Sequence, residues 1–209
     1  MATGASDLLA NTGGVEITLG KEMIRTPVDD AIGYIKKTVI GDVMNIKKVR
    51  VDKEGTGMGW GAVYAQYLES MDQIGEQGNG LSVSRQLYKG DEALNESAPL
   101  KVGDKITVRL TIKADRDLDY VQIKDGRAAC MEPLQAVSGF RWSNGLGYYQ
   151  ATKDASTQFF IDQMRKGTYV IEYQVYVNRT GEYQTGIATV QSAYAPEFGG
   201  HTGGYRAMV

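Results

Sequence analysis

Alternation of apolar and polar residues over short segments is the feature that most constrains the fold of this chain. In the segment 106–113 every second residue is isoleucine, valine or leucine, and threonine, arginine and lysine stand between them. The segment 169–178 has tyrosine, isoleucine and valine at every second position. A period of two residues places alternate side chains on opposite faces of a β-strand. Both segments therefore predict strands with one face buried.

Several other segments have the composition or the alternation of short strands. They are 15–20, 33–39, 45–51, 60–68, 81–88, 120–124, 158–162 and 183–192. Helical periodicity is nearly absent, although 6–10 could be the tail of a helix. Many short strands separated by turn signals are typical of a sandwich of two sheets. We expect an all-β chain with an immunoglobulin-like antiparallel β-sandwich, preceded by a smaller β domain.

A polar stretch from Lys89 to Pro99 interrupts the strand pattern. It is rich in glycine, aspartate, glutamate, asparagine and serine, residues that favour turns and linkers. The 209 residues are enough for one large domain or two small ones. The sequence thus predicts a first domain over residues 1–90 and a second over residues 91–209.

Composition and charge weigh against several classes of function. The net charge of −2 argues against nucleic-acid binding, because phosphate binding needs a basic surface. No run of 18 apolar residues is present, so we expect no direct membrane insertion. The first residues lack the basic and apolar regions of a signal peptide. With Cys130 as the single cysteine, an intrachain disulfide is excluded.

Few residues suit catalysis. His201 is the only histidine and lies in a glycine-rich segment, which orients a catalytic base poorly, so we interpret it as an ordinary surface residue. A glycosidase would need two carboxylates across a cleft, and Glu132, Glu172 and Asp162 are candidates whose spacing decides nothing. The sequence predicts that the chain is not an enzyme.

No metal or cofactor site is predicted either. One histidine and one cysteine cannot make a typical zinc site. The acidic segment 115–119 lacks the glycine and distal glutamate of a calcium loop and is interpreted as a solvated turn. The glycines in 55–59 are not followed by the lysine of a phosphate-binding loop.

The 13 tyrosines leave an alternative function open. Seven of them could line a sugar-binding face, as in a carbohydrate-binding or adhesion module: Tyr148, Tyr149, Tyr169, Tyr173, Tyr176, Tyr183 and Tyr194. Alternatively, strand tyrosines complete a sandwich core while their hydroxyl groups reach solvent, which we favour.

The second half of the chain contains a series of sequence blocks in a fixed order: 119–127, 132–133, 138–140, 145–149, 159–162, 166–173 and 194–198. Together these blocks resemble the C-terminal domain of bacterial alpha-2-macroglobulins. Earlier segments, 15–20, 33–37 and 60–67, also match. The resemblance implies that residues 1–90 are a CUB-like β segment following a helical thioester-type domain, and that residues 91–209 are the last macroglobulin domain, of the receptor-binding type.

The resemblance also implies a function and a location. The parent would be a periplasmic or cell-envelope protein, often a lipoprotein, that traps a broad range of endopeptidases. This chain would be non-catalytic, with the other domains of the parent chain as its direct partners and target proteases reached through the parent. It would pack on the helical domain and shield the thioester from water, without a cofactor or metal.

The resemblance assigns a site role to one residue, Tyr194. A tyrosine near the C-terminus helps to form the wall around the thioester, and Tyr194 is at the matching position, with Ala193 where the family has a larger methionine. The cysteine motif of the thioester is only mimicked here. Pro133 stands where the family has the glutamine that supplies the acyl group, so Cys130 is interpreted as a small, partly buried apolar residue.

Overall fold

The computed structural model describes residues 14–25, 36–41, 46–55, 59, 61–64, 66–95 and 98–209. The chain forms two compact units, residues 1–66 and residues 67–209, each of which is described by itself. None of the helices in the described ranges has the length and apolarity that a membrane crossing requires.

The described strands of the first unit form a small antiparallel sheet in the order β2-β1-β3. Its strands are β1 (Val15–Leu19), β2 (Glu22–Arg25) and β3 (Val49–Lys53). Gly20 opens the tight turn between β1 and β2 with a φ of 60°, a left-handed conformation that glycine adopts at little cost. The strand predicted from residue 15 is confirmed, whereas the strand predicted over 45–51 begins only at Val49.

Two predicted strands of the first half have a different outcome. Of the segment 33–39, the first three residues lie outside the described residues and the others form no strand. The described residues of 60–68 form no strand either, and Val63, Tyr64 and Leu68 are exposed, so that prediction was wrong. Apolar and aromatic composition favours a strand only where a neighbouring strand can pair with it.

The second unit is built almost wholly from antiparallel strands, with one short 3-10 helix, η2 (Met71–Gln73). The strands are β4 (Gln77–Asn79), β5 (Leu81–Lys89), β6 (Glu92–Ala93), β7 (Lys105–Ala114), β8 (Leu118–Gly126), β9 (Met131–Pro133), β10 (Gly139–Ser143), β11 (Leu146–Thr152), β12 (Ser156–Met164), β13 (Gly167–Val177), β14 (Glu182–Gln184), β15 (Ala188–Ser192), β16 (Gly199–His201) and β17 (Arg206–Met208).

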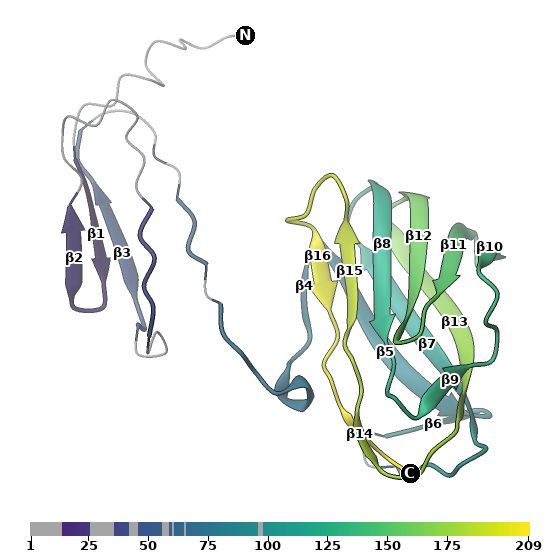
Figure 1. The fold of residues 1–209 in the computed structure, drawn as a ribbon. Helices are drawn as coiled ribbons and strands as arrows, with labels where there is room; N and C mark the ends of the chain where they lie inside the picture. Colours follow the sequence, from purple (N-terminus) through teal and green to yellow (C-terminus); the bar gives the residue numbers. More distant parts are fainter. Residues whose placement is uncertain are drawn as a thin grey trace. The chain divides into compact units, whose positions relative to one another are not determined.

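Most of these strands form one hydrogen-bonded path that folds over into two layers (Figure 1). The order is β10-β11-β12-β8-β15-β16-β4-β5-β7-β13-β9, with β6 beside β5 and β14 paired with β17. Strands β10, β11, β12, β8 and β15 form one layer, and β5, β7, β13 and β9 form the other. The predicted all-β antiparallel sandwich is therefore confirmed.

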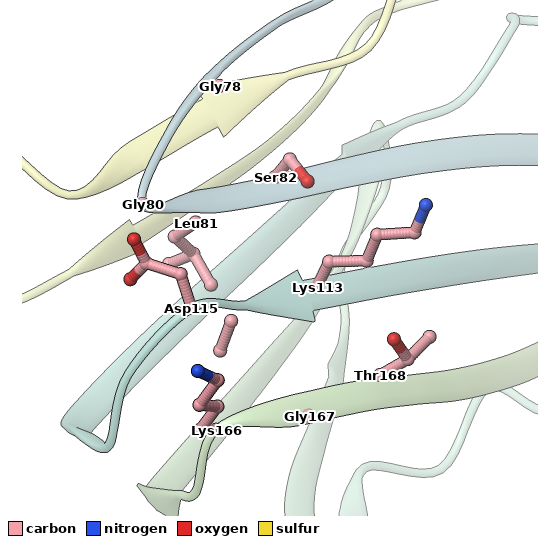
Figure 2. A pocket seen from close by; sticks show the side chains of 10 residues that line it. Gly78, Gly80, Leu81, Ser82, Lys113, Asp115, Lys166, Gly167 and Thr168 are labelled. Atoms are coloured by element: carbon pink, nitrogen blue, oxygen red, sulfur yellow. The ribbon is translucent and has the colours of Figure 1, made fainter.

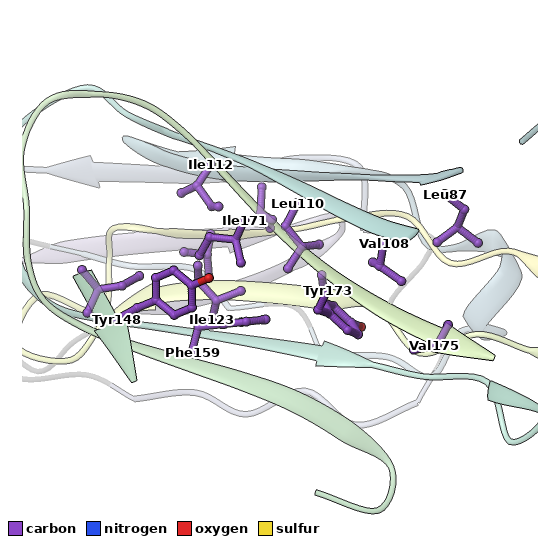
Figure 3. Packing of buried hydrophobic residues seen from close by; sticks show 14 of the residues in the cluster. Leu87, Val108, Leu110, Ile112, Ile123, Tyr148, Phe159, Ile171, Tyr173 and Val175 are labelled. Carbon is purple, nitrogen blue, oxygen red and sulfur yellow. The ribbon is translucent and has the colours of Figure 1, made fainter. Parts of the chain in front are cut away.

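The core lies between these layers, and the alternating strands supply it. Ile106, Val108, Leu110 and Ile112 of β7 are buried, as the alternation predicts. Figure 3 shows Val108, Leu110 and Ile112 facing side chains of the other layer, including Phe159. The Phe159 ring lies 5.8 Å from the Tyr173 ring of β13, centroid to centroid, and 5.6 Å from that of Tyr148. Aromatic contacts thus join the two layers at the centre of the core.

The structural division of the chain differs from the predicted boundary at residue 90. Strand β5, assigned to the first domain by that boundary, pairs with β7 from Leu81↔Ala114 to Tyr88↔Thr107. Leu81, Val83 and Leu87 are part of the sandwich core. The polar stretch after Lys89 is therefore the connection between two adjacent strands of one unit, because turn composition marks a hairpin as readily as a linker.

Candidate functional site

Tyr194, the one residue that the resemblance assigns to a site, lies just beyond the end of β15. Its side chain is 79% exposed. The ring contacts that of Tyr120 on β8 edge to face, with centroids 5.2 Å apart and planes at 83°. The backbone N–H of Ala193 donates to the carbonyl of Tyr120 at 2.9 Å. The start of β8 and the residues after β15 thus hold Tyr120 and Tyr194 together as an exposed pair of aromatic rings.

Tyr120 has an unusual backbone conformation, with a φ of 53°. The left-handed region is uncommon for residues other than glycine and costs free energy for a bulky side chain. Around it the alternation of β8 is broken, because Leu118 and Val121 are both buried although they are three residues apart. The opposite strand shows the same break, with Ile161 and Met164 buried. This local irregularity brings the Tyr120 ring to the outside, beside Tyr194.

The loop 193–198, which carries Tyr194, is anchored at both ends. The Ser192 N–H donates to the carbonyl of Phe198 at 3.1 Å, and Asn79 Nδ2 donates to the carbonyl of Glu197 at 2.7 Å. Phe198 packs under the guanidinium of Arg116, 4.2 Å from the ring centroid. A side chain at Gly80 would collide with the Phe198 ring, with a Cβ only 2.8 Å away. These contacts therefore fix the conformation of the loop at this end of the sandwich.

A buried polar network crosses the sandwich. Arg85 of β5 binds Asp125 of β8 through Nη1 and Oδ1 at 2.6 Å, and the Tyr173 hydroxyl of β13 donates to the other carboxylate oxygen at 2.8 Å. Arg85 Nη1 also donates to the carbonyl of Gly126 at 3.1 Å, and Nη2 to Thr185 Oγ1 at 3.2 Å. The cavity beside these groups holds only about 10 Å³, room for one water molecule. The network ties the two layers together and leaves no space for a substrate.

Burial changes the ionisation of this network. Loss of solvation raises the pKa of Asp125. Arg85 and the Tyr173 hydroxyl act in the opposite direction and partly offset this rise. Burial also raises the pKa of Tyr173 well above 10, and the neighbouring carboxylate adds to the shift. The tyrosine hydroxyl therefore stays protonated and remains a hydrogen-bond donor to Asp125 at neutral pH.

A hollow of about 440 Å³ lies where β5 and β13 begin and β7 ends (Figure 2). The charged side chains Lys113, Asp115 and Lys166 line it, with glycine backbone between them. Arg116 Nε holds the Asp115 carboxylate at 2.7 Å and lowers its pKa through this hydrogen bond. The hollow offers two ammonium groups, the hydroxyl groups of Ser82 and Thr168, and a carboxylate that is already paired with Arg116.

Comparison with known proteins identifies the family of the sandwich. Residues 80–197, more than half of the chain, match the family described as the bacterial alpha-2-macroglobulin MG10 domain. The chain belongs to this family. The match includes β5, which agrees with the place of that strand in the second unit.

Solved macroglobulin structures share the fold. Salmonella alpha-2-macroglobulin reacted with methylamine superposes with a TM-score of 0.53 at 16% identity, over 94% of this chain and 13% of that one. Native Escherichia coli alpha-2-macroglobulin from domain MG7 to the C-terminus gives 0.54 at 13% identity, over 97% and 34%. The elastase-activated E. coli protein gives 0.56 at 13% identity, over 94% and 18%. The chain thus spans between 13% and 34% of these matched chains.

A curated relative is similar in sequence over a smaller share of its length. Circularly permutated Ras protein 2 of Dictyostelium discoideum is 26% identical over 166 residues, which is 76% of this chain and 4% of that protein. So small a share carries no functional argument for the MG10-family chain.

The tyrosines of the MG10-family sandwich do not converge on one face. Tyr148 and Tyr173 are buried in the core, and Tyr169 and Tyr183 are partly buried against it. Tyr149 points outward from β11, Tyr176 from β13 in the other layer, and Tyr194 stands at the sandwich end. The structure therefore brings together no tyrosine-lined groove from the set considered for sugar binding.

Cys130 and His201, the single thiol and the single imidazole of the chain, lie in ordinary structural positions. Cys130 is fully buried, more deeply than predicted, and burial raises the pKa of its thiol, which disfavours the reactive thiolate. His201 lies in β16 between β15 and β4, opposite Thr189 and Gln77. The first half of the glycine-rich segment, Gly199–His201, is thus a paired strand, where the small residues permit close approach of neighbouring backbones.

The carboxylates considered for glycoside hydrolysis are dispersed. Glu172 is bound to Arg109 at 2.5 Å, and Glu132 accepts a hydrogen bond from Asn178 at 3.2 Å, both on the outer face of the β13 layer. Asp162 lies on the outer face of the opposite layer. The Glu172–Asp162 and Glu132–Asp162 pairs cannot face each other across a cleft, and no three metal-ligating side chains meet within the described ranges.

Proposed function

We propose that this chain is the non-catalytic C-terminal part of a bacterial macroglobulin-type inhibitor that traps a broad range of endopeptidases. Membership of the MG10 family supports the proposal, as does the small share of the solved macroglobulins that the chain spans. In this proposal residues 1–66 belong to the CUB-like segment, and residues 67–209 are the last macroglobulin domain. The parent works in the periplasm or the cell envelope.

The role of the chain is to pack on the helical thioester-type domain of the same longer protein. The observation that carries this role is the Tyr120–Tyr194 pair, an exposed aromatic contact between β8 and a loop that is anchored at both ends. Exposed apolar groups that the fold holds in place mark surfaces for other proteins or domains. A wall of rings over a thioester excludes water and so slows its hydrolysis.

Replacing Tyr194 with alanine in the longer protein tests this role. Because the ring is exposed, we expect the free energy of unfolding to change by no more than about 0.5 kcal/mol. The thioester should nevertheless hydrolyse several-fold faster, measured as the rate at which a free thiol appears in buffer.

Tyr176→Ala is the matched control, because Tyr176 is also exposed but lies on the outer face of the other layer. It should leave the rate unchanged. Equal rates for Tyr194→Ala and the unmodified protein, or a parent that forms no thioester, would contradict the shielding role.

A further inference from the structure

The sandwich has an open edge at β10, the first strand of the sheet order. β10 pairs with β11 on one side, from Gly139↔Gln150 to Ser143↔Leu146. Within the described part of the chain no strand pairs with its other side. The opposite end of the sheet is β9, which is only three residues long and contains Pro133, two features that discourage pairing. The fold thus blunts one edge and leaves backbone donors and acceptors free on the other.

The face of the sheet beside this edge is aromatic. Phe140 and Trp142 point to the outer face of β10 and are 79% and 77% exposed. Phe140 lies opposite Tyr149, which lies opposite Phe160, so that a row of rings crosses three strands. Trp142 is seated on the backbone of Gly147, where a Cβ would lie 2.9 Å from two ring atoms. Apolar side chains of an added strand would meet Phe140 and Trp142 here.

The residue between Phe140 and Trp142 in the sequence is Arg141, a cation whose side chain lies on the other face of β10. Arg141 is exposed, and in the described ranges its guanidinium donates only to two neutral oxygens, Gln135 Oε1 and the carbonyl of Val137, both at 3.4 Å. A second copy paired antiparallel about the centre of β10 would place Arg141 opposite Arg141, a destabilising like-charge pair. The charge therefore disfavours self-pairing and favours a partner with a carboxylate at this position.

We propose that β10 is a docking edge for an extended peptide segment of another protein, with the pattern apolar–acidic–apolar. The segment adds as an antiparallel strand through main-chain hydrogen bonds. Its acidic side chain lies opposite Arg141, and the apolar residues before and after it pack on Phe140 and Trp142. This site is separate from the Tyr194 loop and does not depend on the shielding role.

The probe is a capped heptapeptide with valine at the odd positions, glutamate at the centre and threonine at the other two. We expect it to shift the NMR signals of the β10 amides and of the Trp142 indole, and to protect β10 amides from hydrogen exchange. Two further versions are N-methylated at alternate residues. The version whose methyl groups face β10 should not bind, because it lacks the main-chain donors, whereas the other should.

Charge exchange provides the specificity test. Arg141→Glu should weaken binding of the glutamate-centred peptide by about threefold to tenfold and strengthen binding of a lysine-centred one. Arg179→Glu, which makes the same charge change at another exposed arginine, should do neither. An unchanged melting temperature shows that each variant is folded.

Three results would overturn the proposal. One is that the glutamate-centred and lysine-centred peptides bind equally well, or that the two N-methylated versions do. Either outcome would mean that the rings adsorb any apolar chain. Another is self-association of the unmodified chain through β10. The third is a shift of the Trp142 signal by neutral oligosaccharides but not by the peptide, which would assign the aromatic row to sugars.

Discussion

Replacing Arg85 with methionine is expected to lower the free energy of unfolding by about 3–5 kcal/mol, because the change leaves the buried Asp125 carboxylate without its cation. The Tyr173 hydroxyl would remain as a donor to the carboxylate, but it carries no positive charge. Whole domains are stable by only about 5–15 kcal/mol, so the variant should be close to unfolding. Urea denaturation followed by far-UV circular dichroism measures the change.

The control removes the network as a whole. In the triple variant Arg85→Met, Asp125→Leu and Tyr173→Phe, no charge or unpaired hydroxyl of these three residues is left buried. Replacing a buried ion pair with apolar groups of similar size is often nearly neutral, so the triple variant should recover most of the lost stability. A triple variant as unstable as Arg85→Met would show that the cost comes from lost packing and not from the orphaned charge.

Replacing Phe159 with alanine is expected to cost about 3–5 kcal/mol, since its ring is fully buried at the centre of the core. The change would leave a cavity beside the Tyr148 and Tyr173 rings, which contact Phe159 from both layers. The midpoint of urea denaturation should fall, while the slope of the unfolding free energy against urea concentration stays unchanged.

The next residue along β12 provides the matched control. Phe160 points to the outer face and is 39% exposed, so Phe160→Ala should cost clearly less than Phe159→Ala, about 1 kcal/mol. Similar losses for the two variants would mean that the assignment of inner and outer faces along β12 is incorrect.

The alternating segments were predictable because burial on one face imposes a period of two. Strands β7 and β13 follow from that rule. The buried ion pair also has a signal in the sequence. Arg85 follows Leu81 and Val83 in the phase of the core, and Asp125 follows Val121 and Ile123 in the same way. Opposite charges at core positions of two strands indicate a buried pair, although the sequence cannot show that these strands face each other.

Other features could not be predicted from the chain alone. The left-handed backbone of Tyr120 depends on the strands that surround it, so local residue preferences gave no sign of its contact with Tyr194. The division after residue 66 was missed because the polar stretch after Lys89 has the composition of both a linker and a hairpin. The open edge at β10 depends on which strand ends the sheet, a property of the topology.

Protease trapping by the proposed parent protein is the most direct test of the proposed function. A protease incubated with that protein should keep its activity on a small chromogenic peptide, which can diffuse to a caged enzyme. It should lose most of its activity on a large protein substrate, which cannot. Full retention of activity on the large substrate, or a gene product without a helical domain before this chain, would contradict the proposal.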